Sequence, residues 1–220
     1  MPRRYSAPAV LGLLALGTAG PASGQRSYAV IPFVGYRVGG GFTDSQQFQW
    51  DIKDNLSYGG MLEFGLAPNA GVDLLYSHQA SEVKTPAVYA QLASSYDLKV
   101  DNWLFGAYRG LNNNRGGSPS TMDAIGEGYL GLTHFASSAG TTASADRFSA
   151  GLGLGLRAQS PTGRIGLRLD ARGLWTFSSG DGGWFCSLPG ACVVTYTGTT
   201  MFQADFTAGV VITLGRSQAR

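Results

Sequence analysis

Residues 147–177, RFSAGLGLGLRAQSPTGRIGLRLDARGLWTF, decide the fold of this chain. Apolar residues occupy every second position from 148 to 156, ahead of the segment QSPTG (159–163), and again from 165 to 171 after it. The positions between them hold glycine, serine and charged residues. A period of two residues is typical of β-strands that have one apolar and one polar face. The segment therefore predicts two antiparallel strands joined by a tight turn.

Six further segments show the same alternation, and three of them show it less regularly. They are residues 28–38, 56–66, 72–77, 101–109, 124–135 and 202–214. The chain therefore predicts eight strands of about ten residues each, the length that a tilted strand needs to cross a bilayer.

The connections between these strands alternate, imperfectly, between short and long. Residues 67–70 and 159–163 are tight turns, and the long connections are residues 41–55, 79–100 and 177–200. Residues 110–122 are longer than a turn requires. Residues 86–96 (PAVYAQLASSY) fit a short helix or a strand extension, and a separate strand there would change the strand count. The order predicts an up-and-down arrangement of neighbouring strands.

The composition excludes several classes of protein. Only 14% of the 220 residues are charged, against roughly 25% in soluble proteins, and glycine accounts for 33 residues. The apolar share of 44% excludes a disordered chain. The net charge of +2 falls to zero once Arg3 and Arg4 are removed with a leader, so no nucleic-acid partner is expected. No cofactor is expected either, because GLGLG (151–155) lacks the strand–helix context of a dinucleotide site.

Residues 1–24 are typical of a cleaved secretory signal peptide, which leaves residues 25–220 as one domain. Arg3 and Arg4 form a basic start, residues 7–19 (APAVLGLLALGTA) form an apolar stretch, and small residues at 22–24 offer a cleavage site. The alternative is an uncleaved anchor helix, but the apolar stretch is shorter than a membrane span.

Cys186 and Cys192 are the two cysteines of the chain and stand in the turn-rich sequence CSLPGAC. In the oxidising compartment that a signal peptide implies, this spacing favours a disulfide that closes a small loop. A metal site is the alternative. It requires two further ligands, and the two histidines, His78 and His134, are distant in sequence.

The polar faces of the predicted strands carry charges of both signs. Nine charged residues lie in mid-strand: Arg37, Glu63, Asp73, Glu127, Arg157, Arg168, Asp170, Arg172 and Asp205. Arginine suits buried, bidentate pairing with carboxylates, whereas all three lysines fall in predicted connections. The pattern favours a membrane barrel with a charge network in its lumen over a soluble sandwich with a wet polar face.

Aromatic residues gather at one end of the apolar faces. If the first strand runs outward through a membrane, seven of the eight strands have an aromatic residue at their outer end, and His134 takes the eighth place. The seven are Tyr36, Tyr58, Tyr76, Trp103, Phe148, Trp175 and Phe202. Such a girdle is typical of a lipid–water boundary. The predicted fold class is therefore all-β, an eight-stranded antiparallel up-and-down transmembrane β-barrel with a lumen filled by side chains.

The chain also resembles a known family. The resemblance rests on VIPFVGYRVGGGF (30–42), LSYGGMLEFGLAPNAGVDLLYS (56–77), residues 147–177, GGWFCSLPGAC (182–192) and FQADFTAGVVITLG (202–215). In this order the segments are similar to small outer-membrane β-barrel proteins of the OmpA/OmpX-like superfamily. The sequence departs from that family in its last residues, ITLGRSQAR, where an aromatic residue is usual. The resemblance implies the outer membrane of a Gram-negative-type bacterium and insertion by the outer-membrane assembly machinery.

The function expected is structural or surface-interacting, without catalysis. We expect a monomer in contact with outer-membrane lipid. The long connections at the outer end would present a surface to an extracellular ligand.

The alternative function is an enzyme that acts on lipid A acyl chains, because some small outer-membrane barrels use a histidine and a serine at the outer end for this chemistry. His78 and His134 are each followed by a serine three residues later, Ser81 and Ser137. This spacing places each serine on the opposite face of its strand from the histidine. The nearest acids, Glu82 and Asp146, lie in predicted loops.

Overall fold

The computed structural model describes most of the chain after the predicted signal peptide. The described ranges are 27–43, 48–67, 69–84, 95–111, 122–137, 143–177, 182–187, 191–196 and 200–214. Within them the chain forms strands and turns and no helix. No described helix is therefore long and apolar enough to cross a membrane. The predicted signal peptide, residues 1–24, lies outside the described residues.

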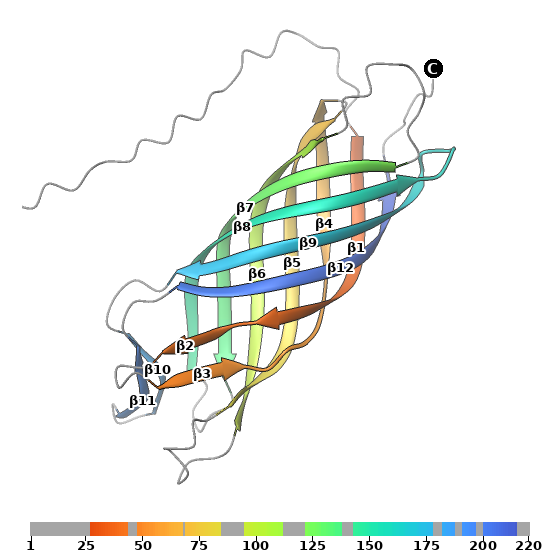
Figure 1. Ribbon diagram of the computed structural model, residues 1–220. Coiled ribbons are helices and arrows are strands. Elements are labelled where there is room, and N and C mark those ends of the chain that lie inside the picture. The colour runs from red at the N-terminus through yellow and green to blue at the C-terminus, as the bar shows by residue number, and fades with distance from the viewer. Residues whose placement is uncertain are drawn as a thin grey trace, which may run out of the picture.

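Eight long strands form a closed antiparallel barrel (Figure 1). They are β1 (Ser27–Gly39), β4 (Asn55–Ala67), β5 (Ala70–Lys84), β6 (Ser95–Gly110), β7 (Met122–Ser137), β8 (Ala143–Gln159), β9 (Ile165–Phe177) and β12 (Thr200–Thr213). Each strand pairs with the next in sequence, and β1 pairs with both β4 and β12, which closes the sheet. The predicted fold class, with eight strands in up-and-down order, is confirmed.

Two short hairpins extend the barrel at one end. β2 (Gly41–Thr43) pairs with β3 (Gln49–Ile52), which in turn pairs with the end of β5. β10 (Gly182–Ser187) pairs with β11 (Ala191–Tyr196). Figure 1 shows both hairpins at the same end of the barrel, which we call the outer end. The sequence predicted long connections here and did not predict the hairpins within them.

The prediction of a long loop over 79–100 is wrong. β5 continues to Lys84 and β6 begins at Ser95, so only residues 85–94 separate them. Gln79, Ser81 and Val83 continue the buried face of β5. The polarity pattern fades because the outward-facing residues of this extension, Ala80, Glu82 and Lys84, are small or charged. Of the segment 86–96, Ser95 and Tyr96 belong to β6, and the rest lies outside the described residues.

The tight turn between β8 and β9 has a clear local cause. Gly163 has a φ of 65°, a left-handed conformation that glycine adopts without strain. Its backbone N–H donates to the carbonyl of Ser160 at 2.8 Å, and the Ser160 N–H donates to the carbonyl of Ile165 at 2.9 Å. The predicted turn at 159–163 is therefore present.

The outer wall of the barrel is apolar. Leucine, phenylalanine, valine and isoleucine side chains point away from the interior on all eight long strands, as Val34, Leu74, Leu152 and Phe206 illustrate. The interior holds polar and charged side chains together with two apolar clusters. The outer cluster consists of Trp50, Ile52, Val83, Leu98, Val100, Phe135 and Met201. The second cluster consists of Ala29, Ile31, Phe33, Met61, Leu75, Leu104, Tyr129, Leu174 and Val211. The sequence pattern did not predict this apolar filling of the lumen.

Candidate functional site

Nine charged side chains predicted for the lumen all lie inside the barrel. Eight of them are at most 7% exposed, and Arg157 is 14% exposed along its side chain. They come from every long strand except β6. In each case the side chain points inward because it occupies the alternate position to an outward-facing apolar residue.

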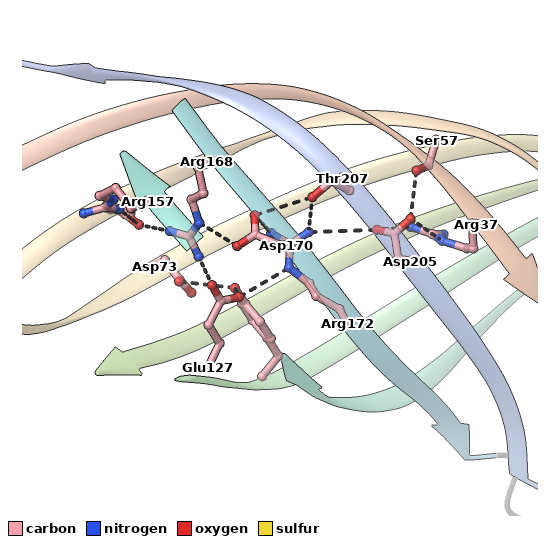
Figure 2. Close-up of polar contacts among 12 residues, drawn as sticks. Arg37, Ser57, Asp73, Glu127, Arg157, Arg168, Asp170, Arg172, Asp205 and Thr207 are labelled. Carbon is pink, nitrogen blue, oxygen red and sulfur yellow. Dashed lines mark hydrogen bonds and ion pairs between the residues drawn. The ribbon is translucent and has the colours of Figure 1, made fainter. Parts of the chain in front are cut away.

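Arg168 is the centre of the network (Figure 2). Its terminal nitrogens contact Glu63 and Glu127, and its Nε donates to Asp170 Oδ1 at 2.8 Å. Arg157 also contacts Glu63. Three carboxylates from three strands therefore surround one guanidinium, a geometry that the planar donor fork of arginine permits.

Arg172 and Arg37 extend the network toward the outer end. Arg172 contacts three acids through its three guanidinium nitrogens. Its Nη2 lies 2.7 Å from Asp170 Oδ2, its Nε lies 3.4 Å from Glu127 Oε2, and its Nη1 lies 3.9 Å from Asp205 Oδ2. The register places Asp205 directly between Arg172 and Arg37, and Arg37 Nε lies 3.4 Å from Asp205 Oδ1. Opposite charges directly across a strand pair stabilise each other. The contacts run without interruption from Arg157 to Arg37 (Figure 2).

Glycines of β8 leave room for these long side chains. A Cβ atom at Gly155 would lie 2.5 Å from Asp170 Oδ1, and one at Gly153 would lie 3.1 Å from Arg172 Cγ. Any larger residue would displace part of the charge network. This steric requirement explains the GLGLG sequence without a nucleotide site.

Asp73 differs from the other four carboxylates of the network. It lies opposite Glu63 in the β4–β5 register, so two acids face each other. Its Oδ2 accepts a 3.4 Å hydrogen bond from the Tyr129 hydroxyl, and its Oδ1 is buried without a partner. Within the described residues no arginine lies within ion-pair distance of Asp73. The network thus contains five carboxyl groups and four guanidinium groups.

The seven predicted girdle residues all point outward, away from the charge network. Five are exposed, and Tyr76 and Trp175 are partly covered by neighbouring rings. The ring centroids of Tyr76 and Trp103 lie 4.4 Å apart, and those of Trp175 and Phe202 lie 5.1 Å apart. Cross-strand register aligns Tyr76, Trp103 and Phe148 through Leu132, so these residues form a continuous belt.

The serines and histidines that were considered for an enzyme acting on lipid A lie on opposite faces of the barrel wall. Ser81 and Ser137 point inward and donate to the backbone carbonyls of Lys53 and Asp97. His78 and His134 point outward. The Ser–His pairs named in the sequence are therefore not assembled, as the H-x-x-S spacing predicted.

Each histidine contacts one aspartate, and the sequence named only one of the two, Asp146. His78 Nδ1 lies 2.7 Å from Asp101 Oδ1, and His134 Nδ1 lies 2.6 Å from Asp146 Oδ1. Asp146 belongs to β8 and not to a loop, whereas Glu82 lies 3.7 Å from Lys53. Asp101 was missed. The alternation places it on the same face as Trp103, but its position opposite His78 depends on the β5–β6 register.

The two cysteines face each other in the β10–β11 hairpin, where the register pairs Cys186 with Cys192. Their side chains lie outside the described residues, so the disulfide stays a prediction. Among the residues that the structure describes, no group of three or more histidine, cysteine or acidic residues could hold a metal ion.

The fold is similar to those of solved bacterial surface and outer-membrane proteins. It matches Neisserial surface protein A (NspA) with a TM-score of 0.56 and 12% sequence identity, over 84% of this chain and 96% of the other. It matches the outer membrane protein OprG from Pseudomonas aeruginosa with a TM-score of 0.51 and 12% identity, over 88% of this chain and 97% of the other. The predicted resemblance to small outer-membrane barrels is therefore confirmed at the level of the fold. Comparison of the sequence with protein-family models and with curated proteins gives no match.

Proposed function

We propose that this protein is an outer-membrane β-barrel of a Gram-negative-type bacterium, with a structural or surface-interaction role and no catalytic activity. The observation that carries the proposal is the polarity of the wall. Apolar side chains cover the outside of all eight long strands, and the charged mid-strand residues point inward. Apolar patches of this extent are rare on soluble monomers. An arginine that faced lipid at the bilayer midplane would cost about 2–4 kcal/mol.

The interior supports a structural role. Buried charges are retained at low cost only when partners satisfy them, and all but one of the lumen carboxylates contact arginine. An eight-stranded barrel is just wide enough for side chains to fill it. The charge network and the two apolar clusters therefore act as the core of the protein.

The proposed partners follow from the location. Lipid surrounds the wall, the outer-membrane assembly machinery inserts the chain after removal of residues 1–24, and an extracellular ligand meets the outer loops. We further propose that the protein is a monomer. The pairing of β1 with β12 closes the sheet and removes the free strand edges through which two copies of the chain could pair.

The test of this proposal is the electrophoretic mobility of the full chain expressed in a Gram-negative host. Closed barrels resist unfolding in detergent, so unheated protein is expected to migrate differently from boiled protein. It is also expected in the outer-membrane fraction. Recovery in the soluble periplasm, with identical migration before and after heating, would overturn the proposal.

The His–Asp hydrogen bonds favour one alternative, an enzyme that acts on lipid A acyl chains. A histidine oriented by a carboxylate is a suitable general base. However, neither of the proposed serines faces its histidine. Mass spectra of lipid A from cells that express the wild-type protein and the His78→Ala/His134→Ala variant are expected to be identical. Loss of an acyl chain with the wild-type protein alone would establish the enzyme.

A further inference from the structure

Four outward-facing residues on adjacent strands form one cross-strand row, His78, Asp101, His134 and Asp146. The register pairs His78 of β5 with Asp101 of β6, Asp101 with His134 of β7, and His134 with Asp146 of β8. We call these four residues the His–Asp row. The neighbours of the row on the inner side belong to the aromatic belt, since Tyr76, Trp103 and Phe148 precede or follow its members by two residues. Two residues of a strand span about 7 Å, so the row lies just beyond the belt.

The hydrogen bonds within the row determine which atoms point outward. A carboxylate only accepts hydrogen bonds, so each histidine donates its Nδ1–H to its aspartate, at 2.7 Å for His78 and 2.6 Å for His134. Asp101 Oδ1 also accepts from the Tyr76 hydroxyl at 2.8 Å, which fixes its orientation. When Nδ1 of an imidazole carries the single ring hydrogen, Nε2 is an acceptor. The histidine Nε2 atoms and the Oδ2 atoms of both aspartates have no partner among the described residues, so this surface consists of acceptors.

The row contains two carboxylates, those of its two aspartates, and most of the residues beside it on the outer side are small. The next register row outward consists of Ala80, Lys99, Ala136 and Ser144, all small except the lysine. Lys99 thus places a single cation beside the acceptors, with short side chains on either side of it.

From this arrangement we propose that the His–Asp row binds the primary ammonium group of a membrane lipid headgroup, and that Lys99 contacts the phosphate of the same headgroup. The inference rests on the proposed membrane location, because the belt places the row at headgroup depth. An ammonium group offers three N–H donors, which matches a surface of carboxylate and imidazole acceptors. Carboxylates on a lipid-facing wall are best tolerated near the interface, where this site lies.

The test is lipid retention by the folded barrel in native mass spectrometry. The probes are short-chain phosphatidylethanolamine, phosphatidylcholine, whose quaternary ammonium has no N–H donor, and phosphatidylglycerol. The wild-type protein is expected to retain phosphatidylethanolamine about three- to tenfold better than phosphatidylcholine. The Asp101→Asn/Asp146→Asn variant is expected to lower that ratio to about one, as expected for loss of charge-assisted hydrogen bonds.

Two variants serve as controls. Tyr36→Phe changes a belt residue on β1, outside the four strands that carry the row, and is expected to leave the ratio unchanged. Lys99→Gln is expected to weaken retention of both zwitterionic lipids equally, because both have a phosphate. The His134→Gln variant provides a second measurement within the row and is expected to lower the ratio.

Several outcomes would overturn the proposal. The first is equal retention of phosphatidylethanolamine and phosphatidylcholine by the wild-type protein, and the second is a preference for phosphatidylethanolamine that survives Asp101→Asn/Asp146→Asn. The others are a preference for phosphatidylglycerol and a preference for phosphatidylethanolamine that a metal chelator abolishes. Each variant is first checked for the heat-dependent shift in migration. A wild-type protein without that shift contradicts the proposed function, whereas a shifted wild-type protein without lipid preference contradicts only this inference.

Discussion

At the scale of the residue, burial without a partner distinguishes Asp73 from the other lumen acids. Asp205 lies between Arg172 and Arg37 and accepts from the Ser57 hydroxyl at 2.8 Å. Asp73 faces Glu63 and has one oxygen without a partner. A buried carboxylate is costly unless it is paired, so the two aspartates should contribute with opposite sign to the free energy of unfolding.

Asp73→Asn is therefore expected to leave the free energy of unfolding unchanged within about 1 kcal/mol, or to raise it, because it removes a buried charge that has no arginine partner. Asp205→Asn is expected to lower it by about 3–5 kcal/mol, because Arg37 would lose its carboxylate. Urea unfolding in lipid vesicles, followed by tryptophan fluorescence, measures both. Equal losses would mean that Asp73 is paired in the folded protein.

The glycines of β8 provide a second contrast between single residues. Gly155→Ala is expected to destabilise the barrel by about 1–3 kcal/mol, because the added methyl group would meet Asp170 Oδ1. Gly60→Ala serves as the matched control, since the nearest atom to its Cβ is the Ile31 carbonyl oxygen at 3.9 Å. It is expected to stay within about 0.5 kcal/mol of the wild type. The same unfolding assay compares the two, and a harmless Gly155→Ala would show that the network does not need this space.

At the scale of the element, each strand carries two faces that meet different surroundings. Leu152 in the middle of β8 is 65% exposed, and Leu66 near the end of β4 is 68% exposed. The two residues differ in their position along the strand and not in their exposure. Depth in the bilayer should therefore decide what a charge costs at each position.

Leu152→Arg is expected to lower the free energy of unfolding in vesicles by about 2–4 kcal/mol, and Leu66→Arg by about 0–1 kcal/mol. The reason is that an arginine side chain near the end of a strand reaches water, whereas one at mid-strand does not. Unfolding of both variants in phosphatidylcholine vesicles provides the comparison. Equal and negligible effects would indicate that water, and not lipid, surrounds the wall.

The hairpins and the strand extensions make the outer end asymmetric. β5 and β6 extend beyond the belt, and β3 pairs with the end of β5. Trp50 and Ile52 of β3 thereby join Val83 and Leu98 in the outer apolar cluster. This contact holds the β2–β3 hairpin against the barrel and buries apolar surface at the outer end.

At the scale of the whole molecule, closure depends on the pairing of the first and last strands. β1 and β12 are separated by almost the whole described chain, yet their register aligns Arg37 with Asp205. The order of the lumen contacts therefore depends on the complete barrel. Loss of the β1–β12 pairing would separate Arg37 from Asp205 and expose two strand edges at once.

Local pattern was sufficient for the number of barrel strands, the face on which the nine lumen charges and the seven girdle aromatics lie, and the tight turn at 159–163. Side-chain direction alternates with every residue in a strand, so polarity along the chain determines the face directly. The same alternation predicted that Ser81 and Ser137 would face away from their histidines.

Only the tertiary structure decided which side chains meet. Contacts such as Arg168 with Glu63, or His78 with Asp101, depend on the register between strands and on the shear of the closed barrel. No local period encodes that offset, because a shift of two residues preserves every face and changes every partner. For the same reason the sequence could not assign partners to Asp73 and Asp101. Only the folded barrel showed that Asp73 lacks an arginine partner and that Asp101 orients His78.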